Sequence, residues 1–403
     1  MTSAQTIHEA LRRTTETLAR ELAAPTGVAP EWSEFEWLIA RATAAMHGVS
    51  ALLAGRLRWR GPQGWDAFLQ DQRRHTQARH FRLQQLMQQI HLAARSADIA
   101  LVALKGAELH TLGVYAPGER PMGDVDLLVQ TKDTDRAARL LVSLGFHETV
   151  PTWKHRVFLP QAVQRPAALG EHSENYLKVE LHDRLREPLP LHPEEVTRWV
   201  QREHPDPGLS GYPSKASLMA HLLLHAAGAM ALRALRLIQL HDLALLSALM
   251  TAQDWDELLG QSSQDGGHWW SAPPLLVLTH YYHCAIPARV LESLTQVCPR
   301  RLVRITRRRT LSDVSFSHLW ISAFPGIEWS RSPAQAARYV MSRVRPSKET
   351  LALREEMVRT HVGTGASQWD RLSQRQRMLR WLTSRQARSE TMHPVRMALA
   401  QTP

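Results

Sequence analysis

The chain has 403 residues, 44% of them hydrophobic, and a formal net charge of +11. This length is enough for two or three domains with a hydrophobic core. A membrane-spanning helix needs about 18 or more consecutive apolar residues, and no run in the sequence reaches that length. The N-terminus is amphipathic and lacks the apolar stretch of a signal peptide, so we expect a cytoplasmic protein. The two cysteines, Cys284 and Cys298, are too few for a disulfide framework or a cysteine zinc site.

The positive charge is concentrated near the C-terminus. Residues 300–403 contain 20 Lys and Arg against 7 Asp and Glu, a net of +13, whereas residues 1–299 have a net of −2. Only six of the 49 basic residues are lysines. A GC-rich genome would explain this preference for arginine without any function.

The first 95 residues are expected to be helical. Between residues 5 and 60, apolar residues recur at helical spacing in two or three short segments, and Gly61-Pro62 ends them. A long amphipathic helix is predicted from Trp65 to about Ser96, and its apolar stripe is typical of core packing. We therefore expect residues 1–95 to form a helical segment that packs against a following sheet.

A strand, a turn and a helix follow in that order. The apolar run Ile99–Leu104 predicts a buried strand, Lys105-Gly106 forms a turn, and residues 107–115 have helical spacing. Pro117-Gly118 then breaks the chain.

The next segment, Gly123–Val129, predicts a strand that carries two acids. Its alternation sends the side chains of Asp124 and Asp126 to the same face. Two carboxylates so placed repel each other unless a cation lies between them, which indicates a divalent metal site. The alternative is a pair of solvated acids on an edge strand.

At this point the sequence resembles a known family. Leu104-Lys105-Gly106, Arg120-Pro121-Met122-Gly123 and Asp124-Val125-Asp126 resemble the core of the nucleotidyltransferase superfamily related to DNA polymerase β. The closest resemblance is to the bacterial branch of uncharacterised nucleotidyltransferase-like proteins, with a more distant likeness to AbiEii-type toxins. Most of the superfamily has Gly-Ser or Gly-Gly where this chain has Gly106-Ala107. A serine contact to the nucleotide phosphates is therefore missing.

The segment after this core predicts a helix and two further strands. Thr131 or Asp133 caps a helix that Gly145 closes, and a strand is expected at residues 156–159. Residues 161–173 are expected to form a loop. Residues 176–182 alternate like a strand, which places Tyr176, Lys178, Glu180 and His182 on one face.

The resemblance implies that Glu180 is the third carboxylate of the site. Nucleotidyl transfer uses two metal ions roughly 4 Å apart, and two acids alone rarely hold both. Asp183 is the nearest competitor, but it would point to the opposite face. The alternative is that Glu180 is an exposed acid on an edge strand.

The resemblance also implies a reaction and a set of nucleotide contacts. Asp124, Asp126 and Glu180 would hold Mg²⁺ (or Mn²⁺) while an acceptor hydroxyl attacks the α-phosphate of a nucleoside triphosphate. Lys105 and the backbone amides of Gly106 and Ala107 suit the outer phosphates. Arg120 is a second phosphate candidate, and a salt bridge to a nearby acid is an equal alternative for it.

Residues 187–298 are expected to be helical after the exit marked by Pro188, Pro190 and Pro193. Helices are predicted at residues 213–229, 232–250, 273–283 and 287–297, with a loop at 262–267. His221 and His225 have a zinc-ligand spacing, but no third ligand is evident, so packed polar residues are the simpler interpretation.

The helix predicted at residues 232–250 contributes further candidates. Related nucleotidyltransferases have a similar helical region that completes the nucleotide cleft, which implies Arg236 and Asp242 as nucleotide-binding candidates. An intrahelical network is the alternative. His241-Asp242 would also suit an HD-type metal phosphohydrolase, but that interpretation leaves Asp124 and Asp126 unexplained.

The basic C-terminal region interleaves arginines with tryptophans. Such a surface binds RNA by phosphate attraction and stacking, lies on an anionic membrane, or is simply an arginine-rich helical end. Residues 390–403 are expected to be frayed.

These observations predict an α+β fold with a small mixed sheet between helical segments. The expected parts are a helical segment (1–95), a nucleotidyltransferase core (96–186), a helical domain that completes the cleft (187–298) and a basic helical region (299–403). The expected function is metal-dependent transfer of a nucleotide from an NTP to an unknown acceptor, with RNA, a small molecule or a protein equally open. The alternative is a catalytically silent nucleotide-binding or scaffold module.

Overall fold

A computed structural model provides the fold, and it describes most of the chain. The ranges described are 3–149, 154–161, 168–190, 192–264, 267–283, 285–348, 350–351, 369 and 372–400.

The centre of the structure is a six-stranded mixed sheet in the order β3-β4-β5-β2-β1-β8. Its strands are β1 (Ala100–Ala103), β2 (Asp124–Val129), β3 (Phe146–Glu148), β4 (Arg156–Pro160), β5 (Lys178–His182) and β8 (Gly208–Ser210). β2 runs antiparallel to β1 and parallel to β5. Because β2 and β5 both lie inside the sheet, the edge-strand alternatives for Asp124, Asp126 and Glu180 are wrong.

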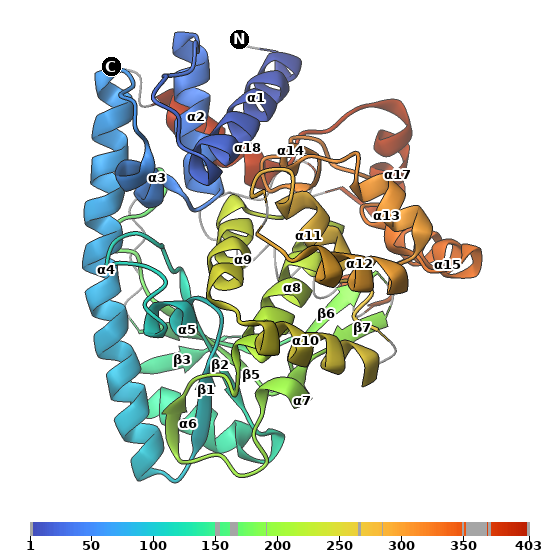
Figure 1. The fold of residues 1–403 in the computed structure, drawn as a ribbon. Helices are drawn as coiled ribbons and strands as arrows, with labels where there is room; N and C mark the ends of the chain where they lie inside the picture. Colours follow the sequence, from blue (N-terminus) through green and yellow to red (C-terminus); the bar gives the residue numbers. More distant parts are fainter. Residues whose placement is uncertain are drawn as a thin grey trace.

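Two helices cover one face of this sheet. They are α4 (Gln63–Ser96), which runs along one whole side of the molecule, and α6 (Thr134–Ser143), which follows the short 3₁₀ turn Thr131–Asp133 (Figure 1). Their apolar side chains pack against alternate residues of the strands, among them Val125, Leu127, Val179 and Leu181. The predicted packing of the N-terminal helical segment against the sheet is confirmed for α4.

The opposite face of the sheet looks toward a group of helices. α8 (Lys215–Ala231) and α9 (Leu237–Leu249) share the largest core cluster with Val102, Leu104 and Leu128 of the sheet side. The other elements of this part are α5 (Gly106–Thr111), α7 (Thr197–Val200), α10 (Ala252–Gln264), α11 (Ala272–Leu278), α12 (Ala288–Val297) and the hairpin of β6 (Arg186–Leu189) and β7 (His192–Glu195).

The two ends of the chain pack together. α1 (Ala4–Ala23) and α2 (Glu34–Met46) lie beside the C-terminal helix α18 (Ser389–Ala400) (Figure 1). Val395 and Ala398 are completely buried in this contact. The prediction that residues 390–403 fray is therefore wrong for residues 390–400. These residues form a helix, although it contains Pro394, because packing against α2 stabilises it. Residues 401–403 lie outside the described ranges.

The remaining helices complete the N- and C-terminal parts. They are α3 (Ser50–Arg56), α13 (Arg300–Thr306), α14 (Leu311–Val314), the 3₁₀ turn Ile327–Trp329, α15 (Pro333–Val344) and α17 (Gln374–Thr383). Cys298 is buried, and Cys284 lies outside the described residues.

Most element boundaries lie within a few residues of the prediction, but α10 extends to Gln264 into the loop predicted at 262–267, and α11 ends at Leu278 instead of residue 283. The helix predicted at residues 232–250 differs as much at its start. It begins at Leu237 because Arg233 has a left-handed backbone (φ +55°) and Leu235 bonds to the Val314 segment instead. Arg236 thereby becomes the residue that precedes α9. Part of the loop expected at 161–173, residues 162–167, lies outside the described ranges.

No single helix among the described residues combines the length and apolarity needed to cross a membrane. Only α2 and α3 taken together reach that length and composition, and they are bent by 111° at the break between them.

Candidate active site

Three carboxylates meet on the face of the sheet that looks toward α8 and α9. Asp126 and Glu180 are direct partners in the parallel pairing of β2 and β5, and Asp124 lies two residues before Asp126 on the same side. Asp126 and Glu180 are 6% and 8% exposed, whereas the side chain of Asp124 is 40% exposed. The predicted three acids are therefore adjacent, with Asp124 at the open end.

Two lysines lie among these acids. The Nζ atom of Lys105 is 2.9 Å from Oδ1 of Asp126. Lys178 forms an ion pair with Glu180 and lies 3.5 Å from Oδ2 of Asp124. The alternation of residues 176–182 predicted Lys178 on this face without a functional role. Its ammonium group lies between Glu180 and Asp124, two of the acids that were expected to bind a cation.

The charges perturb one another strongly. Burial tends to raise the pKa of Asp126, but Lys105 and His182 outweigh it and hold that pKa well below the ordinary value. Burial and the charges of Asp126 and Asp124 raise the pKa of Glu180 to about 7, against the opposing effect of Lys178. Adjacent carboxylates with opposite pKa shifts are typical of sites built to hold a cation or transfer a proton.

Two histidines also belong to this cluster. His182 Nε2 lies 3.0 Å from Oδ1 of Asp126 and 3.8 Å from Oε2 of Glu180. His155, next to the start of β4, brings its Nε2 to 3.5 Å from the same Glu180 oxygen. His155, Glu180 and His182 can together hold a metal ion. The alternation of β5 placed His182 on the correct face, but nothing local in the sequence indicated His155.

The three acids and Lys105 line a cleft of about 420 Å³ between the sheet and the helices α8 and α9, whereas Lys178, His155 and His182 lie beside it. The sheet side contributes Lys105, Gly106, Asp124, Asp126 and Glu180, and the helices contribute Leu222, His225, Arg236 and Asp242. The acids and the predicted nucleotide-binding residues, except Ala107, therefore line one cleft.

The turn at Lys105 is held in an unusual conformation. Lys105 has a left-handed φ of +50°, a strained backbone for a residue with a side chain. Its backbone N–H donates to the Tyr212 hydroxyl at 3.2 Å, and that hydroxyl lies 2.6 Å from Nδ1 of His221. His221 therefore supports the turn through Tyr212. It is a packed polar residue, as the simpler interpretation of the His221 and His225 spacing predicted.

The two residues after Lys105 differ in what they offer a phosphate. α5 begins at Gly106, where an added Cβ would lie 2.2 Å from Nη1 of Arg120. The Ala107 N–H donates to the Leu104 carbonyl at 3.2 Å, and the Ala107 side chain is buried. Ala107 can therefore bind a phosphate only if that turn bond opens, so its assigned role stays a prediction.

Arg120 and Asp242 form a two-bond ion pair. Nε of Arg120 donates to Oδ1 of Asp242 at 2.8 Å, and Nη2 donates to Oδ2 at 2.7 Å. The Tyr115 hydroxyl donates to the same Asp242 at 2.6 Å. The salt-bridge alternative for Arg120 is thus observed, and it fixes the guanidinium beside Gly106 at the cleft wall.

Arg236 is a further cation of the cleft, beside Lys105, Arg120 and Lys154. Its side chain is exposed and its guanidinium lies 5.0 Å from the centre of the Phe316 ring, which also lines the cleft. No acid is paired with it among the residues that the structure describes. Arg236 is thus available to an anionic ligand.

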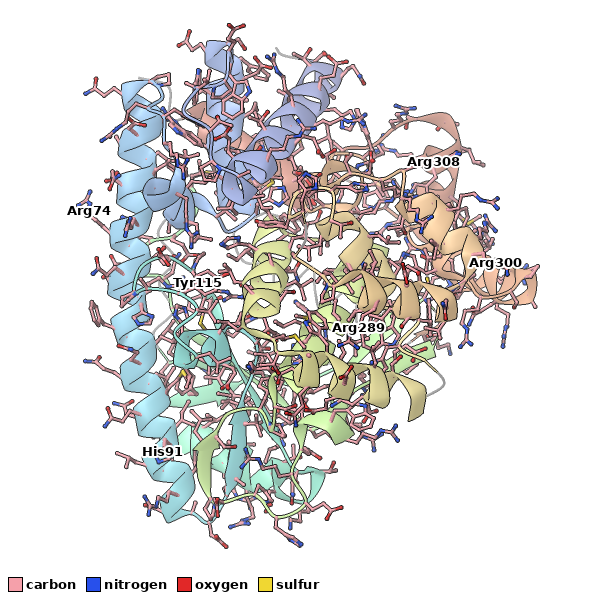
Figure 2. The ribbon with its side chains drawn as sticks, in the orientation of Figure 1. Arg74, His91, Tyr115, Arg289, Arg300 and Arg308 are labelled. Atoms are coloured by element: carbon pink, nitrogen blue, oxygen red, sulfur yellow. The ribbon has the colours of Figure 1, made fainter. Side chains whose placement is uncertain are left out.

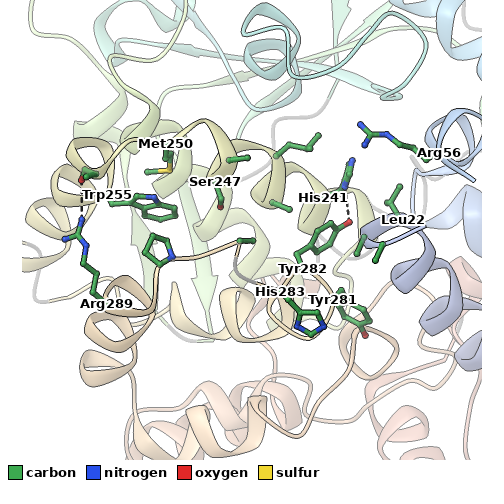
Figure 3. A pocket seen from close by; sticks show the side chains of 18 residues that line it. Leu22, Arg56, His241, Ser247, Met250, Trp255, Tyr281, Tyr282, His283 and Arg289 are labelled. Atoms are coloured by element: carbon green, nitrogen blue, oxygen red, sulfur yellow. Dashed lines mark hydrogen bonds between the residues drawn. The ribbon is translucent and has the colours of Figure 1, made fainter. Parts of the chain in front are cut away.

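The side chains of His241 and Asp242 line two different clefts beside α9. His241 Nδ1 lies 2.9 Å from the Tyr282 hydroxyl and faces a second cleft of about 770 Å³, lined also by Trp255, Tyr281 and Arg289 (Figure 3). His225 lies 3.1 Å from Glu187. Within the described ranges these groups do not converge on one point, so the geometry does not favour an HD-type phosphohydrolase.

The start of the basic C-terminal region carries several exposed arginines. Arg300, at the start of α13, and Arg308, just after its end, lie at the outer edge of the molecule (Figure 2). With Arg304 and Arg307 they line a shallow groove beside the end of α12. A groove with four arginines is a suitable surface for a polyanion.

Comparison with known proteins gives one match. A family model described as an uncharacterised nucleotidyltransferase matches residues 33–269, which is more than half of the chain and includes the whole cleft except Phe316. No curated protein and no solved structure matches the chain significantly. The comparisons show no likeness to the AbiEii-type toxins.

Proposed function

Because the chain belongs to this uncharacterised nucleotidyltransferase family, we propose that it transfers a nucleoside monophosphate from an NTP to an acceptor, with a divalent metal ion. The observation that carries the proposal is the pairing of Asp126 with Glu180 on adjacent parallel strands, with Asp124 beside them. Three carboxylates from separate segments meet in a cleft whose other walls carry cations. This is the distribution of charge that a metal-bound polyphosphate requires.

The residues present fit a divalent cation. Asp124, Asp126 and Glu180 offer six carboxylate oxygens, the ligand type that Mg²⁺ and Mn²⁺ prefer. Lys105 and Lys178 lie where positive charge is needed, which indicates that the acids attract cations into this space. When bound, a metal ion would neutralise the charge that develops on the α-phosphate and on the leaving pyrophosphate.

The protein's own groups have separate tasks in this reaction. The acceptor hydroxyl attacks the α-phosphorus, the bond to the β-phosphate breaks, and one of the carboxylates takes the hydroxyl proton. Arg120, fixed by Asp242, binds an outer phosphate beside Gly106. Arg236 contacts the nucleotide from the opposite wall, where Phe316 offers an apolar surface next to it.

A catalytically silent module is the second candidate, and two observations favour it. The Ala107 amide is occupied by the Leu104 carbonyl, and two lysines already neutralise part of the acidic charge. Such a module binds a nucleotide without turning it over.

The acceptor is proposed only by class. The four arginines of the groove at α13 and just after it support an RNA acceptor, whereas the cleft itself accommodates a small molecule or a side-chain hydroxyl equally well. We propose the cytoplasm as the location, where NTPs are available.

Incubation with each α-labelled NTP, Mg²⁺ or Mn²⁺ and a cell extract tests the proposal. Label transferred to a discrete product by the wild type, lost with EDTA and in Asp126→Asn, is the expected result. Asp183→Asn is the matched control, because Asp183 follows β5 but does not line the cleft. Nucleotide binding without any labelled product, in extracts of several kinds, would favour the silent module.

A further inference from the structure

Two histidines lie beside the carboxylates of the cleft without lining the cleft themselves. His155, Glu180 and His182 each present one ligand atom, and these atoms lie within 4.8 Å of one another. The oxygen of Asp126 nearest to them is 3.0 Å from His182 Nε2. Neither histidine was needed to explain the proposed binding of Mg²⁺ by the three acids.

The spacing of these atoms suits one common ion. Ligand atoms bound to an ion at about 2.0–2.2 Å are themselves roughly 3 to 3.5 Å apart. The His155–Glu180 and His182–Glu180 separations are 3.5 and 3.8 Å, and all three ligand atoms lie within 4.8 Å of one another. Only small side-chain movements are needed to bring all three residues onto one metal.

The backbone holds this arrangement independently of any ion. Arg156 pairs with Leu181 across β4 and β5, so His155 and His182 lie at the next position of that register. Glu180 and His182 alternate onto the same face of β5. A histidine pair and a carboxylate from two adjacent strands are therefore presented together by the sheet itself.

The ligand atoms themselves indicate which class of ion suits this group. It offers two imidazole nitrogens and one carboxylate oxygen. Neutral imidazole nitrogen is a good ligand for Zn²⁺ and Co²⁺ and a poor one for Mg²⁺, which prefers oxygen.

We propose that His155, Glu180 and His182 form a binding site for a divalent transition-metal ion of the Zn²⁺ class, next to the Mg²⁺-type oxygens of Asp124 and Asp126. The inference deepens the proposed function and rests on it for the ion's chemical role, but not for the existence of the site. The site would give the cleft two unlike metal positions, with Glu180 shared between them.

Titration of the purified full-length protein with Co²⁺, followed by its visible absorption, tests the site directly. We expect one equivalent of Co²⁺ to produce a visible band that Zn²⁺ removes and excess Mg²⁺ does not. His155→Ala and His182→Asn should weaken Zn²⁺ binding by roughly 100-fold or more. His147→Ala, which removes an exposed histidine of β3, should bind like the wild type.

A ligand exchange keeps the test informative if His182→Asn fails to fold. His155 is partly accessible, and its replacement by cysteine retains a metal ligand. His155→Cys should bind Co²⁺ and add a sulfur-to-cobalt charge-transfer band. Absence of that band, or Co²⁺ binding by His155→Ala equal to wild type, would overturn the inference and leave a plain hydrogen bond between His182 and Asp126.

The two proposals fail separately. If Co²⁺ does not bind but Mg²⁺ supports label transfer, the transition-metal site is wrong and the nucleotidyltransferase proposal stands. If Co²⁺ binds at His155 and no NTP label is ever transferred, the site stands and the proposed function is wrong.

Discussion

The two faces of β2 and β5 are made from alternate residues of the same strands and have opposite properties. On one face Val125, Leu127, Val179 and Leu181 are at most 1% exposed and pack under α4 and α6. On the other face Asp124, Asp126, Lys178, Glu180 and His182 lie in or beside the cleft toward α8 and α9. Neighbouring residues thus differ completely in their surroundings.

This difference separates stability from function. The apolar face removes hydrocarbon from water, which stabilises the sheet. The charged face places like charges close together, which costs free energy unless cations offset them. We infer that the apolar face fixes the register that brings Asp126 beside Glu180, so a rigid scaffold supports an electrostatically unfavourable site.

The largest expected effect comes from neutralising the charged face at its centre. Asp126→Asn keeps the shape of the side chain but removes the carboxylate that Lys105 and His182 contact. We expect nucleotidyl transfer to fall on the order of 10³-fold, because this charge stabilises the reacting centre. Initial rates with labelled NTP measure the loss, and circular dichroism shows whether the variant is folded. Undiminished turnover would exclude Asp126 from the reaction.

The adjacent residue on the apolar face should give the opposite pattern. Leu127 is completely buried, and Leu127→Ala leaves a cavity between β2 and the helices behind it. We expect the free energy of unfolding to fall by about 2–5 kcal/mol. Below the unfolding transition, kcat per folded molecule should stay within about twofold of the wild type. Denaturant titration measures the free energy of unfolding, and assays at low temperature measure kcat. A loss of kcat without a loss of stability would contradict the assignment of stability to one face and function to the other.

A smaller effect is expected at the turn above the acids. In Gly106→Ala the new methyl group would lie 2.2 Å from Nη1 of Arg120, whose guanidinium cannot move without leaving Asp242. Losing one charge-assisted phosphate contact should raise KM for the NTP about tenfold with little change in kcat. Gly123→Ala is the matched control, because Gly123 lines the same cleft and its Cβ would meet no atom within 4 Å. Equal KM values for both variants would contradict the role of Arg120.

The smallest effect is expected for the affinity of the divalent ion when Lys178, one of the two lysines among the acids, is replaced. Lys178→Met removes an ammonium group that pairs with Glu180 and lies near Asp124. A divalent ion then meets less repulsion, so we expect its affinity to rise by up to about tenfold. Mn²⁺ titration monitored by electron paramagnetic resonance measures the change. Lys132→Met, at an exposed lysine outside the cleft, should leave the affinity unchanged. Weaker binding in Lys178→Met would mean that Lys178 orders the acids instead of competing with the ion.

The strands and their acids were predictable because a strand has a period of two residues. The alternation of residues 124–129 and 176–182 identified which side chains share a face, and the structure agrees for residues 124–129 and 178–182, where β2 and β5 form. That Glu180 lies opposite Asp126 was not predictable from spacing, since the pairing joins distant segments; it came from the family resemblance.

The features of the site and fold that the sequence did not predict depend on contacts between elements that are distant along the chain. His155 reaches Glu180 only through the pairing of β4 with β5, and Asp242 reaches Arg120 only because α9 packs over the sheet. Residues 389–400 lack a strong local signal for a helix and contain Pro394. Their order depends on burial against α2, which no local pattern reveals.

A crystal of the protein with Mn²⁺ and a non-hydrolysable NTP tests the central claim most directly, since anomalous scattering locates the manganese. We predict an anomalous peak in contact with carboxylate oxygens of Asp126 and Glu180, and triphosphate density that extends toward Arg120. Manganese and nucleotide bound together elsewhere, for example in the cleft beside Tyr282, would contradict the account.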